Sequence, residues 1–265
     1  MKETFLKNAL KARLAAGRAC LNGWLAIPSG FSAEVMARAG WHSVTVDLQH
    51  GVQDYLSMVQ CFQAMVAYPV TPMVRVPWNE PGIIGKVLDA GAWGVICPMV
   101  NTAEEARALV AACLYPSKGN RSNGPVRAGG YGEPGNLYQG FANDELLVLP
   151  MIETRQAVDN LEEILDVPGI SGVYVGPSDM GLSFGMSPTL DREEPEILDI
   201  YARVIQETGR RSLITGLHNA APAYAARMIG LGFRIITITS DATLLGKIAQ
   251  ETVRQIQTAA GEAAR

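Results

Sequence analysis

The chain alternates between short apolar runs and segments in which apolar residues recur every three or four positions. The runs are typical of strands buried on both faces, and the periodic segments predict amphipathic helices. The predicted strands cover residues 23–27, 43–48, 71–76, 94–99, 146–152, 172–175, 212–215 and 234–238. Because strand and helix alternate eight times without a composition break, residues 1–265 are predicted to form a single (β/α)₈ TIM barrel rather than two domains or a doubly wound sheet.

Two acidic residues follow consecutive predicted strands in the middle of the chain. Glu153 comes directly after the strand 146–152, and Asp179 ends the Gly-Pro-Ser-Asp turn after the strand 172–175, with a helix predicted over 154–166. The two strands of such a unit are parallel, so both carboxylates should emerge at one edge of the sheet. A single acid there can also cap a helix. Two converging carboxylates repel each other without a cation or a shared proton between them, which favours a metal site.

Few polar residues follow the predicted strands, and in a (β/α)₈ barrel the chemistry lies at the carboxyl ends of the strands. The set consists of Asp47, Gln49, His50, Arg75, Glu153 and Asp179. Two carboxylates with open coordination positions suit a hard divalent ion, whereas zinc would need more His or Cys ligands. We therefore expect Mg²⁺, Mn²⁺ or Co²⁺ as cofactor.

An ion beside an arginine predicts chemistry on a 2-oxo acid. The ion can chelate the carboxylate and keto oxygens, Arg75 can add positive charge where an enolate develops, and His50, oriented by Asp47, can move the proton. Two plainer interpretations stay open, a structural histidine and an arginine that only forms a salt bridge. None of the six lysines follows a predicted strand, so a Schiff-base mechanism has no candidate nucleophile.

Composition narrows the class of partner. A formal net charge of -4 at pH 7, without a basic cluster, argues against nucleic acid or an anionic membrane and favours a small-molecule substrate. The four cysteines form no C-x-x-C pair and lie in apolar contexts, as expected of reduced core residues in a cytoplasmic protein. Residues 1–15 carry several charges and predict a short amphipathic helix rather than a signal peptide.

One long segment has no clear periodicity. Residues 115–144 are rich in Gly, Pro, Asn and Ser, which is long for a structureless connection. Because the segment links a helix to a strand, we expect it to begin opposite the catalytic face and to contact another subunit. Its arginines, Arg121 and Arg127, are interpreted as solvated.

Several motifs are similar to those of the HpcH/HpaI aldolases, a family of metal-dependent pyruvate aldolases. They are the V-D-x-x-H-G turn within GWLAIPSGFSAEVMARAGWHSVTVDLQHG, then MVRVP, LDAGAWGVICPMVNTAEEA, YPSKGNR, the I-E-T and G-P-S-D stretches of MIETRQAVDNLEEILDVPGISGVYVGPSDMGLSFG, and GFRIITITSDATLL. The resemblance covers nearly the whole chain. It implies a barrel assembled as a homo-hexamer, a trimer of dimers, with the last helix exchanged between neighbouring barrels.

The resemblance also implies roles for individual residues. Glu153 and Asp179 match the metal ligands, Arg75 the arginine facing the pyruvate enolate, and His50 with Asp47 the acid/base pair. Asp89 matches an acid that can reach a neighbouring active site, although locally it is a helix-end carboxylate. The turn of Gly176, Pro177 and Ser178 matches the site for the substrate carboxylate, and Trp24 matches a wall of the aldehyde pocket, with a core aromatic as the plainer interpretation.

Two positions depart from the family pattern. Gln49 stands where members usually carry a glutamate beside the base, which changes the local charge, and Met151 stands where several relatives have a polar side chain. The resemblance implies a class II aldolase that reversibly adds pyruvate or hydroxypyruvate to an aldehyde through a metal-stabilised enolate, giving a 4-hydroxy-2-oxo acid. The alternatives are an acyl-CoA lyase on the same barrel, or a catalytically inactive barrel that serves as an assembly module.

Overall fold

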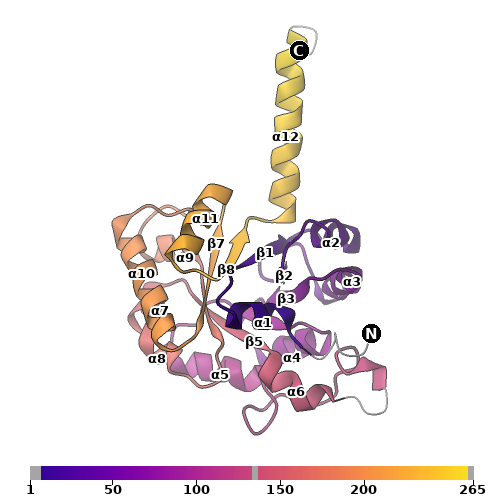
Figure 1. Cartoon of the computed structure of the whole chain (residues 1–265), viewed down its shortest axis with the longest axis vertical. Helices are drawn as coiled ribbons and strands as arrows, with labels where there is room; N and C mark the ends of the chain where they lie inside the picture. The colour runs from indigo at the N-terminus through magenta and orange to yellow at the C-terminus, as the bar shows by residue number, and fades with distance from the viewer. Residues whose placement is uncertain (1–6, 133–136, 262–265) are drawn as a thin grey trace.

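The computed structural model describes residues 7–132 and 137–261 and shows a closed barrel of parallel strands (Figure 1). Each strand pairs with the next in chain order, and β8 closes the barrel on β1. The strands are β1 Cys20–Leu25, β2 Ser43–Asp47, β3 Thr71–Arg75, β4 Gly94–Cys97, β5 Leu147–Ile152, β6 Gly172–Val175, β7 Ile214–Asn219 and β8 Ile235–Ile238. The predicted (β/α)₈ barrel is therefore confirmed.

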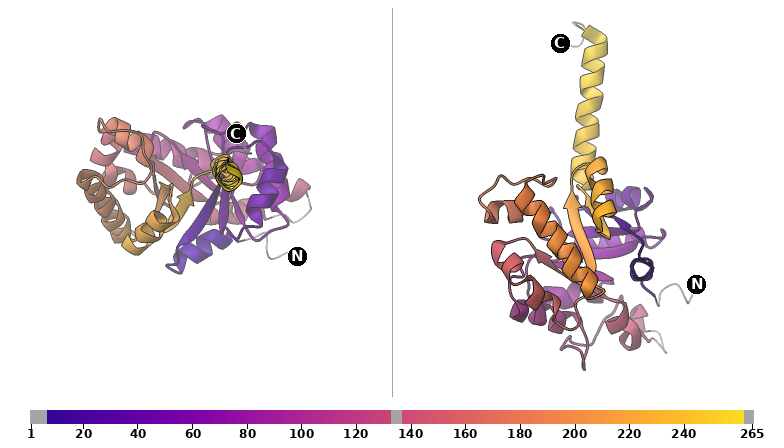
Figure 2. Two further views of the ribbon diagram at one scale, coloured as in Figure 1. Left: turned by 90° about the horizontal axis from the view of Figure 1, so that it is seen from above. Right: turned by 60° about the vertical axis from the view of Figure 1, so that its left-hand side comes forward.

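Helices surround the barrel and bury their apolar faces against the strands (Figures 1 and 2). The surrounding helices are α2 Gly30–Ala37, α3 Tyr55–Met65, α4 Pro81–Asp89, α5 Ala103–Cys113, α7 Arg155–Asp159, α8 Leu161–Leu165, α10 Pro195–Arg210 and α11 Pro222–Leu231. Sequence-local capping fixes where several of them begin. Asp54 and Thr102 both form capping boxes, in which the side chain accepts a hydrogen bond from the backbone three residues on.

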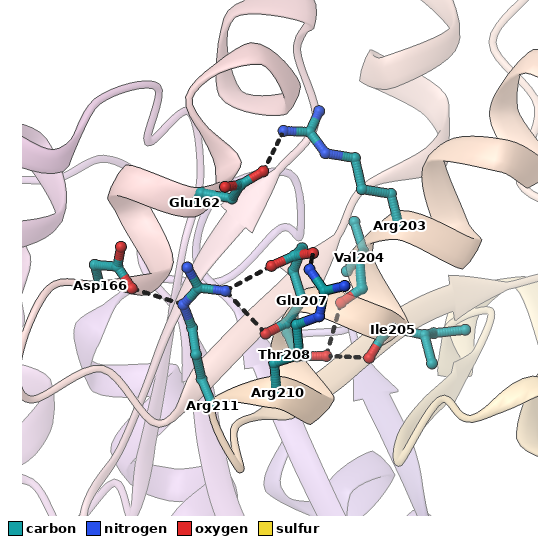
Figure 3. Close-up of polar contacts among 9 residues, drawn as sticks. All are labelled: Glu162, Asp166, Arg203, Val204, Ile205, Glu207, Thr208, Arg210 and Arg211. Carbon is teal, nitrogen blue, oxygen red and sulfur yellow. Dashed lines mark hydrogen bonds and ion pairs between the residues drawn. The ribbon is translucent and has the colours of Figure 1, made fainter.

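Ion pairs join α10 and the residue after it, Arg211, to α8 and the residue after it, Asp166 (Figure 3). The Arg211 side chain binds Asp166 at 2.6 Å and Glu207 at 2.7 Å, and Arg203 binds Glu162 at 3.3 Å. The contacts of Arg211 with Asp166 and of Arg203 with Glu162 join residues more than forty positions apart in sequence, whereas Glu207 lies four residues before Arg211. They lock the outer helices on either side of β6, the strand that precedes Asp179.

The amino-terminal helix α1, Ala9–Ala15, closes one end of the barrel. Leu10 and Leu14 are buried in the same cluster as the barrel-filling side chains Met73 and Leu147. The Asn8 side chain caps α1 and also donates to the carbonyl oxygen of Trp93, at the start of β4. Within the described residues, the predicted amino-terminal helix is thus confirmed over its second half, and its first residues, 1–6, lie outside the described part.

Several predicted boundaries differ from the structure. The first strand covers Cys20–Leu25 rather than 23–27, and other strand ends shift by one or two residues. The single helix expected over 154–166 is divided at Asn160 into α7 and α8. The backbone of Asn160 is not helical, and its side chain donates a hydrogen bond to the carbonyl oxygen of Asn101. The strand expected over 212–215 begins later and continues to Asn219. Gly216 lies inside this strand, and a glycine is required there because an added Cβ would lie 2.5 Å from the Tyr174 ring, which fills the barrel.

The interpretation of Arg121 and Arg127 as solvated is wrong. The Arg121 side chain is 1% exposed, binds Asp89 at 2.6 Å and lies between the rings of Tyr115 and Tyr138. Arg127 donates to the carbonyl oxygen of Ala90 at the end of α4. The segment also contains a 3₁₀ turn, η1 Gly130–Gly132, and a helix, α6 Tyr138–Glu145, so side-chain contacts with α4 and α5 hold it in place. The proposed contact of this segment with another subunit stays a prediction.

The last helix leaves the barrel. Helix α9, Pro177–Ser183, directly follows β6. The carboxyl-terminal helix is α12, Asp241–Ala260, and it projects away from the strands (Figures 1 and 2). Asp241 is its one buried residue, and its carboxylate anchors the helix by accepting from the backbone of Ala26 at 2.7 Å and from Ser32 at 2.6 Å. The large apolar side chains exposed on it are Leu244, Leu245, Ile248, Val253 and Ile256. No helix in the described residues is long and apolar enough to cross a membrane.

Candidate active site

A buried ion pair joins the carboxyl ends of β2 and β3. Asp47 and Arg75 are register partners, and the carboxylate accepts from Nε at 2.8 Å and from Nη2 at 2.6 Å. Trp24 on β1 donates to the same carboxylate at 3.1 Å, and its ring lies 4.9 Å from the Arg75 guanidinium carbon. Burial alone would raise the pKa of Asp47, but the hydrogen bonds and charge of Arg75 hold it below its usual value. Asp47 is therefore an anion that fixes the arginine fork.

The predicted relation between Asp47 and the His50 ring differs from the structure. Asp47 accepts hydrogen bonds from the backbone N–H groups of Gln49, at 3.1 Å, and His50, at 3.3 Å. The His50 side chain is exposed, and its ring makes no hydrogen bond to any described residue. Asp47 thus shapes the turn that presents His50 but does not orient its imidazole.

The Gln49 side-chain oxygen is buried and has no partner within the described part of the chain.

Glu153 and Gly176 bring the ends of β5 and β6 close together. The Glu153 side chain is buried and accepts from the backbone N–H of Met99 at 2.7 Å. An added Cβ on Gly176 would lie only 2.4 Å from the other Glu153 oxygen, so glycine is needed for this approach. Asp179 lies in the first turn of α9, and its negative charge acts on Glu153. The two carboxylates are thus near enough for their charges to interact, and their role as metal ligands stays a prediction.

The electrostatics of Glu153 fit a site for a cation. Burial raises the pKa of Glu153 to about 7, with a further contribution from Asp179, while the Met99 N–H and Arg75 oppose the rise. Among the described residues, Glu153 and Asp179 form no direct ion pair with a basic side chain, and the charge of Arg75 does not outweigh the effect of burial on Glu153. Among residues 7–132 and 137–261, no group of three or more His, Cys, Asp or Glu side chains could hold a metal. Two carboxylates with further positions left to water or substrate suit Mg²⁺ or Mn²⁺.

A buried arginine holds the turn between β6 and α9. Arg192 donates through Nε to the carbonyl oxygen of Pro177 at 3.2 Å, and its Nη1 binds Glu194 at 2.9 Å. Gly181 lies directly against the guanidinium, where a larger side chain would clash. Since Pro177 and Ser178 immediately precede Asp179, this clamp sets the position of that carboxylate. Sequence reasoning missed Arg192 because Pro177 and Gly181, which it contacts, lie more than ten positions earlier in the chain.

A second histidine also lies at this end of the barrel. His218, on β7, packs edge-on against the Trp24 ring with centroids 4.9 Å apart, and it is the register partner of Thr237 on β8. It was missed because the predicted strand ended at residue 215, before the histidine. The alternation of Ile214, Gly216 and His218 on one face, counted from the middle of β7, is the signal that would have found it.

Asp89 lies away from these residues. It is the last residue of α4 and directly precedes the turn into β4, so it belongs to the amino ends of the strands, where Arg121 binds it. Within one chain the structure therefore separates Asp89 from Arg75, Glu153 and Asp179. Any catalytic part for Asp89 would require a second subunit, which stays a prediction.

Comparisons with known proteins decide the family. Residues 23–246 match the family model described as HpcH/HpaI aldolase/citrate lyase. The chain belongs to this family. Within it, the chain is 37% identical over 237 residues to a hydroxypyruvate/pyruvate aldolase of Rhizorhabdus wittichii, a match that covers 89% of this chain and 94% of the relative.

Other HpcH/HpaI relatives agree in sequence and in fold. A 4-hydroxy-2-oxo-heptane-1,7-dioate aldolase of Salmonella dublin is 37% identical over 248 residues, with 92% of this chain and 93% of the relative covered. The crystal structure of an HpcH/HpaI aldolase/citrate lyase family protein from Burkholderia cenocepacia J2315 superposes with a TM-score of 0.88 at 27% identity, covering 95% of this chain and 100% of that one. The family resemblance expected from the motifs is thus confirmed.

Proposed function

We propose that this protein is a metal-dependent class II aldolase that reversibly joins pyruvate or hydroxypyruvate to an aldehyde, giving a 4-hydroxy-2-oxo acid. The observation that carries the proposal is the pairing of two features at one end of the barrel. The buried Asp47–Arg75 pair offers a fixed cation, and the buried Glu153 offers an anion without a basic partner among the described residues. A 2-oxo acid needs both features. A cation such as Arg75 stabilises the negative oxygen of the enolate, and a divalent ion held by carboxylates fixes the position of the substrate.

Glu153 and Asp179 are the residues that would hold the divalent ion. When bound, the ion supplies Lewis-acid polarisation of the 2-oxo acid. The Met99 N–H and the close approach of Gly176 restrict the rotation of the Glu153 carboxylate, and the Arg192 clamp sets the turn that carries Asp179. The backbone of Gly176, Pro177 and Ser178 leads into the first turn of α9, where Asp179 lies. Pro177 has no N–H group and Gly176 donates to the carbonyl oxygen of Ile152, so we assign the substrate carboxylate to the N–H groups of Ser178 and Asp179.

Arg75 is assigned to the developing enolate oxygen. Its guanidinium is held on one edge by Asp47 and lies beside the Trp24 ring, so it is preorganised before substrate arrives. A preorganised donor stabilises charge that appears in the transition state without further rearrangement. Trp24 provides an apolar wall beside Arg75, which suits the carbon chain of the aldehyde.

His50 is assigned to the proton transfer. Its exposed imidazole is free to take the C3 proton of the 2-oxo acid, and the electron pair left behind moves into the enolate. The C3 carbon then attacks the aldehyde carbon, a new C–C bond forms, and the carbonyl electron pair becomes an alkoxide. His50 returns its proton to that alkoxide. Cleavage of the product follows the same steps backward.

The projecting helix supports the proposed assembly. α12 is 20 residues long, about 30 Å, and exposes apolar side chains along its length instead of packing on its own barrel. Exposed apolar faces of this extent are usually covered by a partner. We propose that α12 packs on a second copy within a homo-hexamer, and that Asp89 with the segment 115–144 faces a neighbouring active site in that assembly.

One experiment tests the activity directly. Protein saturated with Mg²⁺ or Mn²⁺ is incubated with pyruvate or hydroxypyruvate and a panel of aldehydes, and the adducts are identified by mass spectrometry. Protein treated with a chelator tests whether the reaction needs the metal, and an acyl-CoA thioester offered as substrate tests the alternative lyase activity. New 4-hydroxy-2-oxo acids that require the metal support the proposal. Thioester cleavage without any aldol product would instead favour a lyase of acyl-CoA.

A further inference from the structure

His218 lies at the partly exposed end of a buried hydrogen-bond chain that crosses the barrel. Ser43 and Thr45 on β2 donate to the Asn22 side-chain oxygen at 2.7 and 3.1 Å, and the Asn22 amide donates to the Thr237 hydroxyl at 2.9 Å. The Tyr174 hydroxyl donates to the same Thr237 oxygen at 2.6 Å. Nδ1 of His218 lies 3.4 Å from the Tyr174 hydroxyl. These side chains are buried inside the barrel, apart from the partly exposed His218.

The direction of this chain selects one tautomer of His218. The Asn22 oxygen already accepts two hydroxyl protons, so its amide nitrogen faces Thr237 and donates. The Thr237 oxygen therefore accepts from both Asn22 and Tyr174. Tyr174 has given its proton to Thr237 and can only accept from His218, which places the imidazole proton on Nδ1.

Nε2 of His218 is consequently a bare acceptor. It has no hydrogen-bond partner in the described part of the chain. Because the His218 side chain is partly exposed and Nε2 is not buried, this nitrogen is accessible at the mouth of the barrel. Crowding by surrounding protein and the charge of Arg75 lower the pKa of His218 to about 4, although Asp47 opposes the shift. The ring stays neutral at neutral pH and keeps its acceptor.

We propose that His218 determines specificity by accepting, through Nε2, a hydrogen bond from an alcohol group of the substrate. The proposal rests on the aldolase function proposed above and names its substrate class, a hydroxylated donor or acceptor. A bare ring nitrogen repels the lone pairs of carboxylate and carbonyl oxygens, and the alcohol is the group that can donate to it. The Trp24 ring beside His218 packs against the carbon that bears this hydroxyl. A substrate without the hydroxyl leaves Nε2 unpaired.

Two sources of the hydroxyl are compatible with this position. It can be the C3 hydroxyl of hydroxypyruvate, which pyruvate lacks, or the C2 hydroxyl of glycolaldehyde, which acetaldehyde lacks. Pairing both donors with both acceptors gives four reactions that differ by single hydroxyl groups. For each reaction, kcat/KM is measured for the metal-saturated wild-type protein and for His218→Leu, which fills similar space without an acceptor, and His218→Gln, which restores an acceptor oxygen.

The expected result is selective. His218→Leu should lose on the order of 10-fold in kcat/KM with the substrate that carries the recognised hydroxyl, the worth of one hydrogen bond, and should stay within about twofold for its unhydroxylated match. His218→Gln should recover most of the loss. A loss confined to hydroxypyruvate identifies the donor as the source, and a loss confined to glycolaldehyde identifies the acceptor.

A second readout reports the tautomer itself. In ¹⁵N-labelled protein, the imidazole shifts assigned by their disappearance in His218→Leu should show protonated Nδ1 and bare Nε2, and Tyr174→Phe should weaken this bias together with the hydroxyl preference. Equal losses in all four reactions, no loss in any, or a proton on Nε2 would overturn the role of His218 and leave the aldolase function standing. Absence of adducts from the wild-type protein in all four reactions would overturn both.

Discussion

Asp47 and Arg75 face each other as register partners on adjacent strands, and both Nε and Nη2 of the arginine donate to the aspartate carboxylate. The pair is fixed by the sheet itself, because parallel strands place the two residues side by side at the same edge. One side of the guanidinium is thus committed to Asp47, and the remaining N–H groups are available at the barrel mouth. Charge alone does not define this arrangement, since it depends on the planar fork of arginine.

Replacing Arg75 by lysine should therefore cost activity although the charge is kept. An ammonium group cannot bind both Asp47 oxygens in this geometry and point a second donor at the substrate, so we expect kcat to fall on the order of 10²-fold. Steady-state kinetics with pyruvate and a responsive aldehyde measure the effect. Arg227→Lys, at an exposed ion pair with Glu193, serves as the matched control. Near wild-type kcat in Arg75→Lys would assign the arginine a structural role only.

Glu153 should destabilise the metal-free protein as the pH rises. Its pKa is about 7 in the folded protein but 4.5 without burial, so between these values the folded state binds more protons and stability falls with increasing pH. The penalty, complete above pH 7, is about 3 kcal/mol by the usual conversion. Glu153→Gln removes this titration, and in EDTA its melting temperature should exceed that of the parent at pH 8 but scarcely at pH 5.

Thermal melts of both proteins at the two pH values test this expectation. Glu163→Gln, an exposed glutamate on α8, is the control and should show little change at either pH. An equal offset of Glu153→Gln at pH 5 and pH 8 would mean that burial of the charge is not the cause. Added Mn²⁺ should stabilise the parent but not Glu153→Gln, because the substitution removes a carboxylate ligand.

Gly176 should be required for metal binding, because it leaves room for the Glu153 side chain. Its backbone angles, φ -104° and ψ 92°, are open to any residue, yet a methyl group there would come within 2.4 Å of a Glu153 oxygen. Gly176→Ala should therefore displace the carboxylate and weaken Mn²⁺ binding at least about 10-fold in calorimetric titrations, in line with the effect of disturbing the support of a metal ligand. Gly230→Ala, where no atom lies within 4 Å, is the control. Unchanged Mn²⁺ affinity in Gly176→Ala would exclude Glu153 as a ligand.

The sequence predicted the barrel because apolar runs alternate with helical patterns eight times, and it placed Glu153, Asp179, Asp47 and Arg75 at the strand ends because those ends share one edge of the barrel. What it could not predict depends on partners distant along the chain. Arg121 is buried by an ion pair with Asp89, 32 positions away, which no local pattern indicates.

The same limit applies to the residues missed at the site. Gly216 belongs inside β7 only because the Tyr174 ring occupies the space of its side chain, 42 positions earlier in the chain. Because the predicted strand 212–215 stopped just before this glycine, His218 was absent from the set of strand-end residues. The exposure of the His50 ring, likewise, follows from the hydrogen bonds that Arg75 and Trp24 already make to Asp47.

The rate of deuterium exchange into pyruvate, measured together with metal binding, distinguishes the role of His50 as a base from the role of the metal ligands. If His50 moves the proton, His50→Ala should bind Mn²⁺ normally but exchange the methyl protons of pyruvate for deuterium roughly 10² to 10⁴ times more slowly, the usual worth of a positioned acid/base. Asp179→Ala should lose metal binding and exchange together. NMR of pyruvate in D₂O follows the exchange without knowledge of the natural aldehyde, because enolisation of the donor precedes the C–C bond.

The chain offers a matched control for this test. His42 lies just before β2, at the opposite end of the barrel, where its Nδ1 accepts from the backbone N–H of Leu21. His42→Ala should lower stability but leave the exchange rate close to that of the parent. Exchange at the parent rate in His50→Ala would place the base elsewhere. His218 is then the next histidine to examine, since it faces the same mouth and its Nε2 carries no proton in the tautomer inferred above.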